Sequence, residues 1–299
     1  AVLANFPTFS PANFVGGISQ SIWDMYNTSE SQYPLLNRAI AGTYPAASTM
    51  KAFSGLAGLK YGFATEGSTW ECGGSWDGFN SGDVQKCWLR TGHGTETFHQ
   101  SIVDSCDITF YEIAKDFWDA GQAGKISETA LQDEIKRYHF GSTSGIDITG
   151  EAAGRIPTPE WKKEFFKDTP EEALWRGGDM TNMAIGQGYV LVTPLQIAVA
   201  YGAIATGKIM QPHLLQDIRN EQGDIVVTHK AQEVDEPVVD AKNLKLMREA
   251  LHGVVNENSD MHECFAQYGI DAAGKTGTAE VAGKDDYAVF VCYAPYDDP

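Results

Sequence analysis

Basic residues are scarce in this sequence. Its 22 Lys and Arg residues stand against 40 Asp and Glu residues, and the formal net charge is −18 at pH 7. A protein that binds nucleic acid needs a basic face to neutralise phosphates, and attachment to an anionic membrane surface has the same requirement. The charge balance therefore argues against both kinds of partner, and solubility is sufficient to explain it.

Long apolar runs and cysteines are scarce as well. No stretch of about 18 apolar residues is present, so the sequence predicts no helix that spans a bilayer. Five cysteines are too few for a disulfide scaffold, and their odd number leaves at least one thiol unpaired. With 42% hydrophobic residues over 299 positions, the chain can still bury the core of one large domain or two smaller ones.

Periodicity and turn residues predict strands at both ends of the chain and helices between them. We expect a strand at 1–9, a hairpin over 214–230, and two final strands around a Gly-Lys-Asp-Asp turn at 283–286. Helices are expected at 47–62, 96–118, 127–139, 193–206 and 240–258. This order predicts an α+β protein whose sheet joins the two chain ends, with a helical subdomain inserted between them.

The helix expected at 47–62 begins with Ser48-Thr-Met-Lys51. Residues three apart on a helix share a face, so the hydroxyl and the amine are neighbours. A serine becomes a nucleophile when a base takes its proton, and a lysine whose pKa is lowered can act as that base. The pattern is common by itself, and the alternative is that Ser48 caps the helix while Lys51 is solvated.

A second candidate is Lys275-Thr276-Gly277-Thr278, near the end of the chain. Glycines around a strand suggest that another group approaches the backbone closely. A lysine and two hydroxyls on such a strand could hold a carboxylate. The alternative is an edge strand protected by its lysine.

Three short motifs, taken together, resemble those of a known family. They are Ser48-x-x-Lys51, Ser105-Cys106-Asp107 and Lys275-Thr276-Gly277, and this set in this order is shared by penicillin-binding proteins and serine β-lactamases. Similar flanking segments are Tyr44-Pro45, GIDITGEAAGRIPTPEWK at 145–162, GQGYVLVTPLQ at 186–196 and KTGTAEV at 275–281.

Over nearly its whole length the chain resembles the transpeptidase domain of a monofunctional class B penicillin-binding protein. The segment SCDITFY at 105–111 resembles the elongation-type members, the penicillin-binding protein 2 family. The resemblance implies a penicillin-binding or serine β-lactamase-like fold, in which helices flank an antiparallel sheet and an all-helical subdomain is inserted.

The resemblance also implies a reaction. Ser48 would attack the penultimate D-Ala carbonyl of a peptidoglycan stem peptide, release the terminal D-Ala, and pass the acyl group to an amine of a neighbouring strand. β-Lactams would acylate the same serine, no cofactor would be required, and the full-length protein would work with the glycan polymerase of the elongation machinery. The resemblance implies that Lys51 is the general base, that Ser105 relays a proton and that Lys275 keeps the site electropositive. Thr276 and Thr278 would bind the substrate carboxylate. The backbone N–H groups of Ser48 and Thr278 would form the oxyanion hole.

Asp107 departs from the wider family, which mostly has Asn here, although elongation-type relatives carry Asp too. Asn can both donate and accept hydrogen bonds, whereas an ionised Asp only accepts. A carboxylate between Lys51 and Lys275 should stay charged and raise the pKa of both lysines. Such a rise would make the neutral form of Lys51 harder to populate.

Three of the five cysteines lie close to this motif or to a long loop that precedes it. Residues 65–94 show no sustained period, and a loop of that length is usually functional or held by something. Cys72, Cys87 and Cys106 could bind Zn²⁺ with His93 as fourth ligand, although their spacing fits no standard zinc motif. The alternatives are a Cys72–Cys87 disulfide, which suits an extracytoplasmic domain, or buried free thiols with a structural histidine.

We expect a domain organisation in which 1–46 and 190–299 form the sheet-containing subdomain. Residues 47–189 would form the mainly helical one, with the Cys-containing loop at 64–94. The resemblance implies a soluble domain excised from a protein at the extracytoplasmic face of a bacterial membrane, without the membrane anchor and pedestal domain of its relatives.

Relatives also continue past this C-terminus with a strand and a helix. In their sheet that strand lies between the first strand and the Lys-Thr-Gly hairpin. Strands at 1–9 and 287–293 would then lack their shared neighbour, and we expect lower stability than in the intact domain.

Two other functions fit parts of the sequence. A β-lactamase or β-lactam sensor would share the fold, but a lactamase needs a deacylating base that the sequence does not place. A catalytically silent scaffold that binds cell-wall partners would not need all three motifs to be chemically competent.

Overall fold

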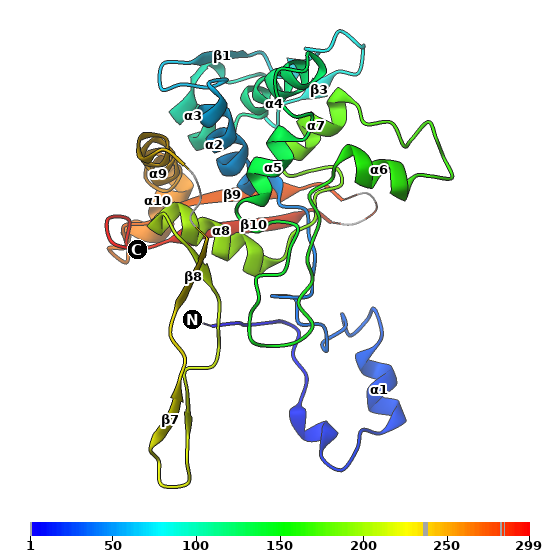
Figure 1. Ribbon diagram of the computed structural model, residues 1–299, viewed down its shortest axis with the longest axis vertical. Coiled ribbons are helices and arrows are strands. Elements are labelled where there is room, and N and C mark those ends of the chain that lie inside the picture. The colour runs from blue at the N-terminus through cyan, green and yellow to red at the C-terminus, as the bar shows by residue number, and fades with distance from the viewer. Residues whose placement is uncertain (1, 236–238, 282, 284) are drawn as a thin grey trace.

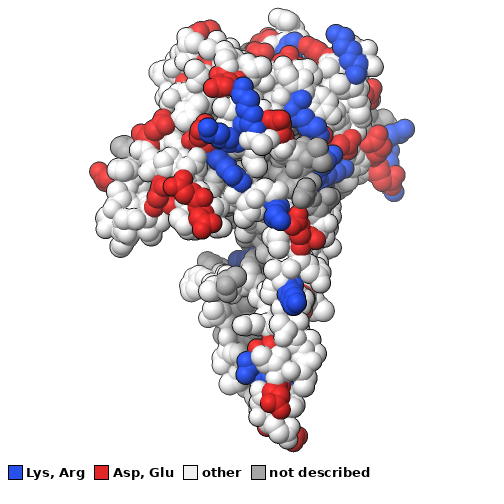
Figure 2. Space-filling view, turned by 60° about the vertical axis from the view of Figure 1, so that its left-hand side comes forward, with Lys and Arg blue, Asp and Glu red and all other residues white. Residues whose placement is uncertain are grey.

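The computed structural model describes residues 2–235, 239–281, 283 and 285–299. Figure 1 shows three tiers: a mostly helical upper part, a middle part built on a long β-hairpin, and a lower part that hangs below it. The upper and middle parts meet at the start of a central helix. On the face in Figure 2, acidic and basic side chains are interspersed over the upper part.

The helices account for most of the upper and middle parts. Among the described residues they are η1 (Pro11–Phe14), α1 (Gln20–Tyr26), η2 (Ala47–Met50), α2 (Lys51–Tyr61), α3 (Phe98–Val103), α4 (Asp107–Gln122), α5 (Ala130–Lys136), α6 (Pro159–Phe165), α7 (Gly177–Ala184), α8 (Pro194–Thr206), α9 (Ala241–Asn256) and α10 (Ser259–Ala266). The predicted helices at 47–62, 193–206 and 240–258 are confirmed as η2 with α2, as α8, and as α9.

Among the residues that the structure describes, the strands form five antiparallel pairs. They are β1 (Thr69–Cys72) with β4 (Gly94–Thr97), β2 (Ser75–Trp76) with β3 (Gln85–Lys86), β5 (Ile209–Gln211) with β8 (Gln232–Asp235), β6 (Asp217–Arg219) with β7 (Ile225–Thr228), and β9 (Ala273–Ala279) with β10 (Tyr287–Tyr293). The predicted hairpin over 214–230 is confirmed as β6–β7. The final two strands are confirmed as β9 and β10, whereas Lys284 of the predicted turn lies outside the described residues.

The strand predicted at 1–9 is wrong. Described residues in this segment pair with no other strand; the Asn5 side chain instead contacts Asn37 and the backbone of Ala39. Leu3 packs beside the small cluster of Ile40, so side chains rather than a backbone ladder hold the segment. The predicted sheet that joins the two chain ends is therefore not present in the described part of the chain.

The predicted loop at 65–94 contains local β structure. Its β1–β4 and β2–β3 pairs are short, and two- to four-residue strands leave no period that a sequence window can detect. The helical region predicted at 96–118 divides into α3 and α4, because the residues between them leave the helix. Ser105 adopts a left-handed φ of 56° at this division.

Helix α2 is the centre of the core. Every residue from Lys51 to Leu59 is buried, as is typical of a helix surrounded by other elements. Phe53 on this helix packs against three rings, those of Tyr138, Phe140 and Tyr201, with centroids 4.8, 4.9 and 5.5 Å away. Because α2 begins at the Ser48–Lys51 motif, its packing places that motif.

Truncation of Phe53 should therefore be costly. We expect Phe53→Ala to lower the free energy of unfolding by about 3–5 kcal/mol, through lost burial and an unfilled cavity. Ile225→Ala, at an exposed position on β7, should change it by less than about 0.5 kcal/mol. Urea unfolding of both variants measures this, and equal effects would show that α2 is not the centre of the core.

Candidate active site

Lys51 lies at the bottom of the site, where its ammonium is held by three oxygens. The Nζ atom lies 2.7 Å from Oδ1 of Asp107, 2.7 Å from the carbonyl oxygen of Ser105 and 3.2 Å from Oγ of Ser105. The Lys51 side chain is fully buried. A buried ammonium needs such partners, since removal from water costs several kcal/mol. The structure thus brings the first and second motifs into direct contact.

Ser48 lies one turn above Lys51, in η2 at the entrance to α2. The residue before it, Ala47, has a left-handed φ of 50°, and its N–H donates to the carbonyl of Gly186 at 2.9 Å. Such a conformation is costly for a residue with a Cβ and is concentrated at functional sites. Gly186 belongs to the segment 186–196 that resembles the family, and a Cβ there would lie 2.2 Å from the Ala47 carbonyl oxygen.

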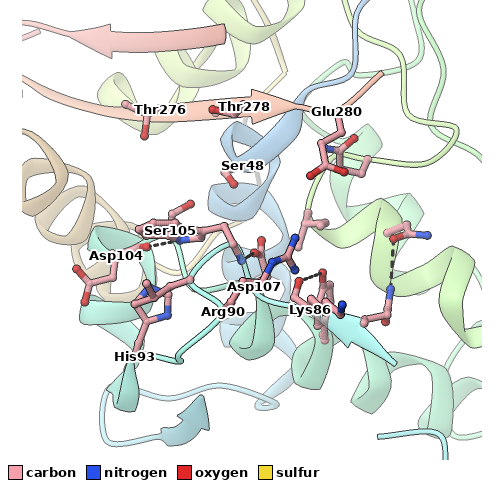
Figure 3. Close-up of a pocket in the computed structure, with 18 of the residues that line it drawn as sticks. Ser48, Lys86, Arg90, His93, Asp104, Ser105, Asp107, Thr276, Thr278 and Glu280 are labelled. Carbon is pink, nitrogen blue, oxygen red and sulfur yellow. Dashed lines mark hydrogen bonds between the residues drawn. The ribbon is translucent and has the colours of Figure 1, made fainter. Parts of the chain in front are cut away.

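Strand β9 forms the opposite wall. Its residues alternate, so that Thr276 and Thr278 are exposed while Lys275 and Gly277 are buried. A Cβ at Gly277 would lie 3.2 Å from the backbone nitrogen of Ser48, so a side chain there would crowd the approach of the strand to the serine. The three motifs therefore meet around one cleft of about 1090 Å³, lined by Ser48, Ser105, Asp107, Thr276, Gly277 and Thr278 among others (Figure 3).

Lys275 is fully buried, on the same side of β9 as Gly277. Burial, and after it the positive charge of Lys51, lower the pKa of Lys275 to about 7, while Asp107 and Asp104 act in the opposite direction. Asp107 raises the pKa of Lys275, as expected, but the net shift of that pKa is downward. The reason is that desolvation of a fully buried ammonium outweighs the attraction of the carboxylate.

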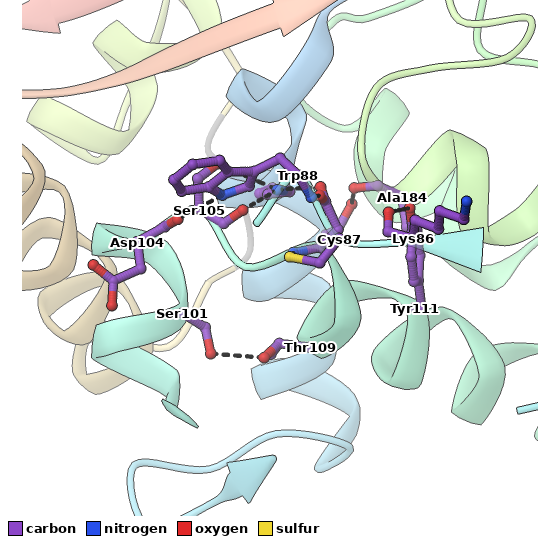
Figure 4. A network of polar contacts seen from close by, with 12 residues as sticks. Lys86, Cys87, Trp88, Ser101, Asp104, Ser105, Thr109, Tyr111 and Ala184 are labelled. Carbon is purple, nitrogen blue, oxygen red and sulfur yellow. Dashed lines mark hydrogen bonds and ion pairs between the residues drawn. The ribbon is translucent and has the colours of Figure 1, made fainter. Parts of the chain in front are cut away.

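Asp107 also connects the site to the Cys-containing loop. Its second carboxylate oxygen accepts the N–H of Trp88 at 2.8 Å, and its own N–H donates to Sγ of Cys87 at 3.4 Å. The Trp88 indole N–H donates to the carbonyl of Asp104 (Figure 4). Sequence reasoning missed Trp88, because nothing in the spacing of the three motifs indicates that this loop touches Asp107.

The predicted metal ligands lie together behind Asp107. The ligand atoms of Cys72, Cys87, Cys106 and His93 are all within 4.8 Å of one another. Nδ1 of His93 is 3.4 Å from the Cys72 sulfur and 3.6 Å from the Cys87 sulfur. Tetrahedral Zn²⁺ with Zn–S bonds of about 2.3 Å requires ligand atoms about 3.7 Å apart, which is close to the two His93 distances.

The thiols themselves are free. The Cys72–Cys87 disulfide considered above is not formed, and Cys264 and Cys292 are exposed thiols. A hydrogen bond from the Cys106 thiol lowers the pKa of Cys87 to about 5, which favours a thiolate inside the cluster. A thiolate is the form that binds metals.

The chain belongs to a known family of acyl-transfer domains. Its sequence matches the penicillin-binding protein transpeptidase domain family over residues 1–299. It is 30% identical to the peptidoglycan D,D-transpeptidase MrdA of Escherichia coli K12 over 314 residues, which cover 99% of this chain and 47% of that protein. The chain thus spans about half the length of this curated relative.

Solved structures of penicillin-binding protein 2 have the same fold. The Pseudomonas aeruginosa protein in complex with WCK 5153 has a TM-score of 0.82 and 29% identity, over 99% of this chain and 63% of that one. The Helicobacter pylori protein in complex with MreC has a TM-score of 0.80 and 29% identity, over 99% of this chain and 51% of that one. The predicted penicillin-binding fold is confirmed. Separately, no helix in the described residues is both long and apolar enough to cross a bilayer.

The low pKa of Lys275 predicts a pH dependence of stability. An unfolded lysine binds its proton up to about pH 10.4, whereas folded Lys275 loses it from about pH 7. The unfolded state thus binds more protons between these values, and stability rises with pH by up to about 1.4 kcal/mol per unit from this group. Urea unfolding at pH 7, 8 and 9 should show this rise in the difference between the free energies of unfolding of the wild type and of Lys275→Met. Parallel curves for the two proteins would contradict it.

Proposed function

We propose that this chain is the catalytic domain of a peptidoglycan D,D-transpeptidase. The observation that carries the proposal is the contact of Lys51 with Asp107 and Ser105 directly below Ser48, in a cleft whose other wall is Thr276 and Thr278. A nucleophile, a proton carrier and hydroxyls that bind a carboxylate are what acyl transfer from D-Ala-D-Ala requires. The name of the E. coli relative supports the same activity.

In the proposed reaction, the Lys51 ammonium first loses one proton to solvent. Oγ of Ser48 then attacks the penultimate D-Ala carbonyl, and the Ser48 proton passes to the neutral amine of Lys51. The N–H groups of Ser48 and Thr278 stabilise the oxyanion, and Thr276 and Thr278 bind the terminal carboxylate. When the C–N bond breaks, Ser105, whose Oγ is 3.2 Å from Lys51, relays a proton to the departing D-Ala. An amine of a second stem peptide then attacks the acyl-enzyme and releases Ser48.

The positions of the two lysines suit different tasks. Lys51 contacts Ser105, which lines the cleft, whereas Lys275 is fully buried and acts through its electrostatic field. We therefore assign proton transfer to Lys51 and electrostatic support to Lys275. The proposed reaction uses no cofactor.

The wider setting follows from the family. We propose that the domain acts at the extracytoplasmic face of a bacterial membrane, where peptidoglycan is crosslinked during elongation, alongside a glycan polymerase. The MreC complex of the H. pylori protein supports an assembly of this kind. Because the chain spans about half of its E. coli relative, these partners belong to the proposal for the full-length protein.

Incubation with a fluorescent penicillin tests the function. We expect a stable adduct on Ser48, seen by intact mass over hours, and none in Ser48→Ala. Ser54→Ala, a buried serine on the same helix, is a matched control that should still be labelled. Rapid turnover of the antibiotic would instead indicate a β-lactamase, and no adduct in the wild type would favour a silent scaffold.

We also propose that Cys72, Cys87, Cys106 and His93 hold one structural Zn²⁺. The proposal is supported by their four ligand atoms, which lie within 4.8 Å of one another. The metal would tie the long loop to the start of α4, where Asp107 begins the helix. Its contribution would be structural, with no step of acyl transfer on it.

Elemental analysis of protein purified without chelator or metal resin tests the zinc site. We expect about one Zn²⁺ per chain and a lower Tm after chelation, since a bound metal stabilises the folded state. Cys72→Ser should lose the metal, whereas Cys264→Ser, at an exposed thiol outside the cluster, should retain it. Zinc-free wild type with an unchanged Tm would exclude the site.

A further inference from the structure

A second, smaller pocket lies away from the cleft, at the C-terminal end of α4. Its walls come from the last turns of α4, the segment before α5, the start of α6 and the segment that leads into α7, which packs against α4. We call it the tryptophan pocket. It is lined by Trp118, Gly121, Gln122, Glu128, Trp175 and Met180 among others, and none of these residues lines the cleft.

Three polar side chains of the tryptophan pocket lack partners within the described part of the chain. The Nε1–H of Trp175 is shielded from solvent and has no acceptor. The side chains of Glu128 and Gln122 are exposed and form neither an ion pair nor a hydrogen bond. A shielded N–H without an acceptor is costly, so the pocket favours a ligand that brings one.

The remaining walls are apolar and held in place by the core. Met180 is fully buried, and both indoles pack against the main hydrophobic cluster. Trp118 also contacts the ring of Phe79, with ring centroids 6.3 Å apart. Walls that are already fixed lower the entropy cost of binding a ligand. They offer an apolar surface to a small group such as a methyl.

Gly121 allows the acidic side of the pocket to approach the helix. A Cβ at this position would lie 3.2 Å from Cα of Glu128 and 3.8 Å from its Cγ. Real Cβ atoms seldom come this close to backbone, so a larger residue would displace the segment that carries Glu128. The glycine therefore keeps the carboxylate beside the end of α4.

The size of the tryptophan pocket limits what can enter it. Its volume is about 60 Å³, and a single water needs about 10–15 Å³ of such space. The pocket therefore holds a group of about four non-hydrogen atoms and excludes a whole drug-sized molecule. A group that suits all of its walls has an acceptor for Trp175, a donor for Glu128 and an apolar end. An acetamido group has these three parts in its carbonyl oxygen, its N–H and its methyl.

We propose that the tryptophan pocket binds the acetamido group of an N-acetylated amino sugar in a glycan strand. The carbonyl oxygen accepts from Nε1–H of Trp175, the amide N–H donates to the Glu128 carboxylate, and the methyl packs against Met180 and the indoles. Gln122 contacts hydroxyls of the same sugar at the rim. The inference rests on the proposed function, because peptidoglycan is a polymer that carries such sugars next to its stem peptides.

The distance between the pocket and the cleft suits one strand that occupies both. Helix α4 begins at Asp107, which lines the cleft, and Gly121 lies next to its last residue. At about 1.5 Å per residue these positions are about 21 Å apart. An extended peptide of about five residues spans about 17 Å, and the sugar adds to this reach. A strand whose stem peptide enters the cleft can therefore place a sugar at the pocket.

NMR titration of the indole N–H resonances tests the pocket. The probes are chitotetraose, a β-1,4-linked tetramer of N-acetylglucosamine, and cellotetraose, which has a hydroxyl in place of each acetamido group. We expect chitotetraose to shift the Trp175 resonance, which is identified by its absence in Trp175→Phe. It should bind at least about tenfold more tightly than cellotetraose, because it makes one neutral and one charged hydrogen bond more. Both titrations are repeated after penicillin has acylated Ser48 and blocked the cleft, and they should be unchanged.

Two substitutions test the assigned contacts, with the Trp118 resonance as readout. Trp175→Phe keeps an aromatic ring and removes the N–H, and Glu128→Gln removes the charge. Each should reduce the preference for chitotetraose to less than about threefold. Trp23→Phe on α1 and Glu221→Gln in the β6–β7 turn, both at exposed positions, are matched controls that should keep the full preference. A dispersed NMR spectrum shows that each variant is folded.

Equal binding of the two sugars, or a preference that survives both substitutions, would overturn the inference. Loss of chitotetraose binding on acylation of Ser48 would overturn it too, because the sugar would then occupy the cleft. Tighter binding of N-acetylalanine methylamide than of chitotetraose would show a site for peptides instead of sugars. Failure of the proposed function is a different result, since it appears as the absence of a penicillin adduct on wild-type Ser48.

Discussion

The ammonium of Lys51 is the group on which the rest of the site depends. A fully buried cation is stable only with well-placed oxygens, and here Asp107 and Ser105 supply three of them. These oxygens come from the junction between α3 and α4, while the lysine comes from α2. The contact therefore joins the central helix to the second motif. It also helps to fix the position of Ser48, one turn before Lys51, in the cleft.

The junction can supply these oxygens because it interrupts the helix. Ser105 with φ of 56° turns both its carbonyl and its hydroxyl toward Lys51, and Asp107 then starts α4. Cys106 between them is fully buried on the other side, within the thiol cluster. One short stretch thus faces the cleft with two residues and a candidate metal site with the third.

The thiol cluster and the cleft share structural parts beyond this stretch. Trp88 and Cys87 both contact Asp107, and the same loop carries Arg90 and Lys86 along the cleft. A loop that is long and poor in regular structure can hold charged side chains in place only if it is tied down. The cluster, the two short strand pairs and the close approach at Gly74 provide those ties.

The residue order alone was sufficient to identify the three motifs, the family and the helix that carries Ser48, because spacing along a helix and motif chemistry are local properties. The period of two in β9 likewise separates buried Lys275 from Thr276 and Thr278. Only the tertiary structure decided what these groups do to one another. Burial reversed the expected direction of the Lys275 pKa, and the strand expected at 1–9 has no partner among the described residues. Both outcomes depend on which distant segments pack together, and pairing and desolvation between distant segments are not encoded in any short window of sequence.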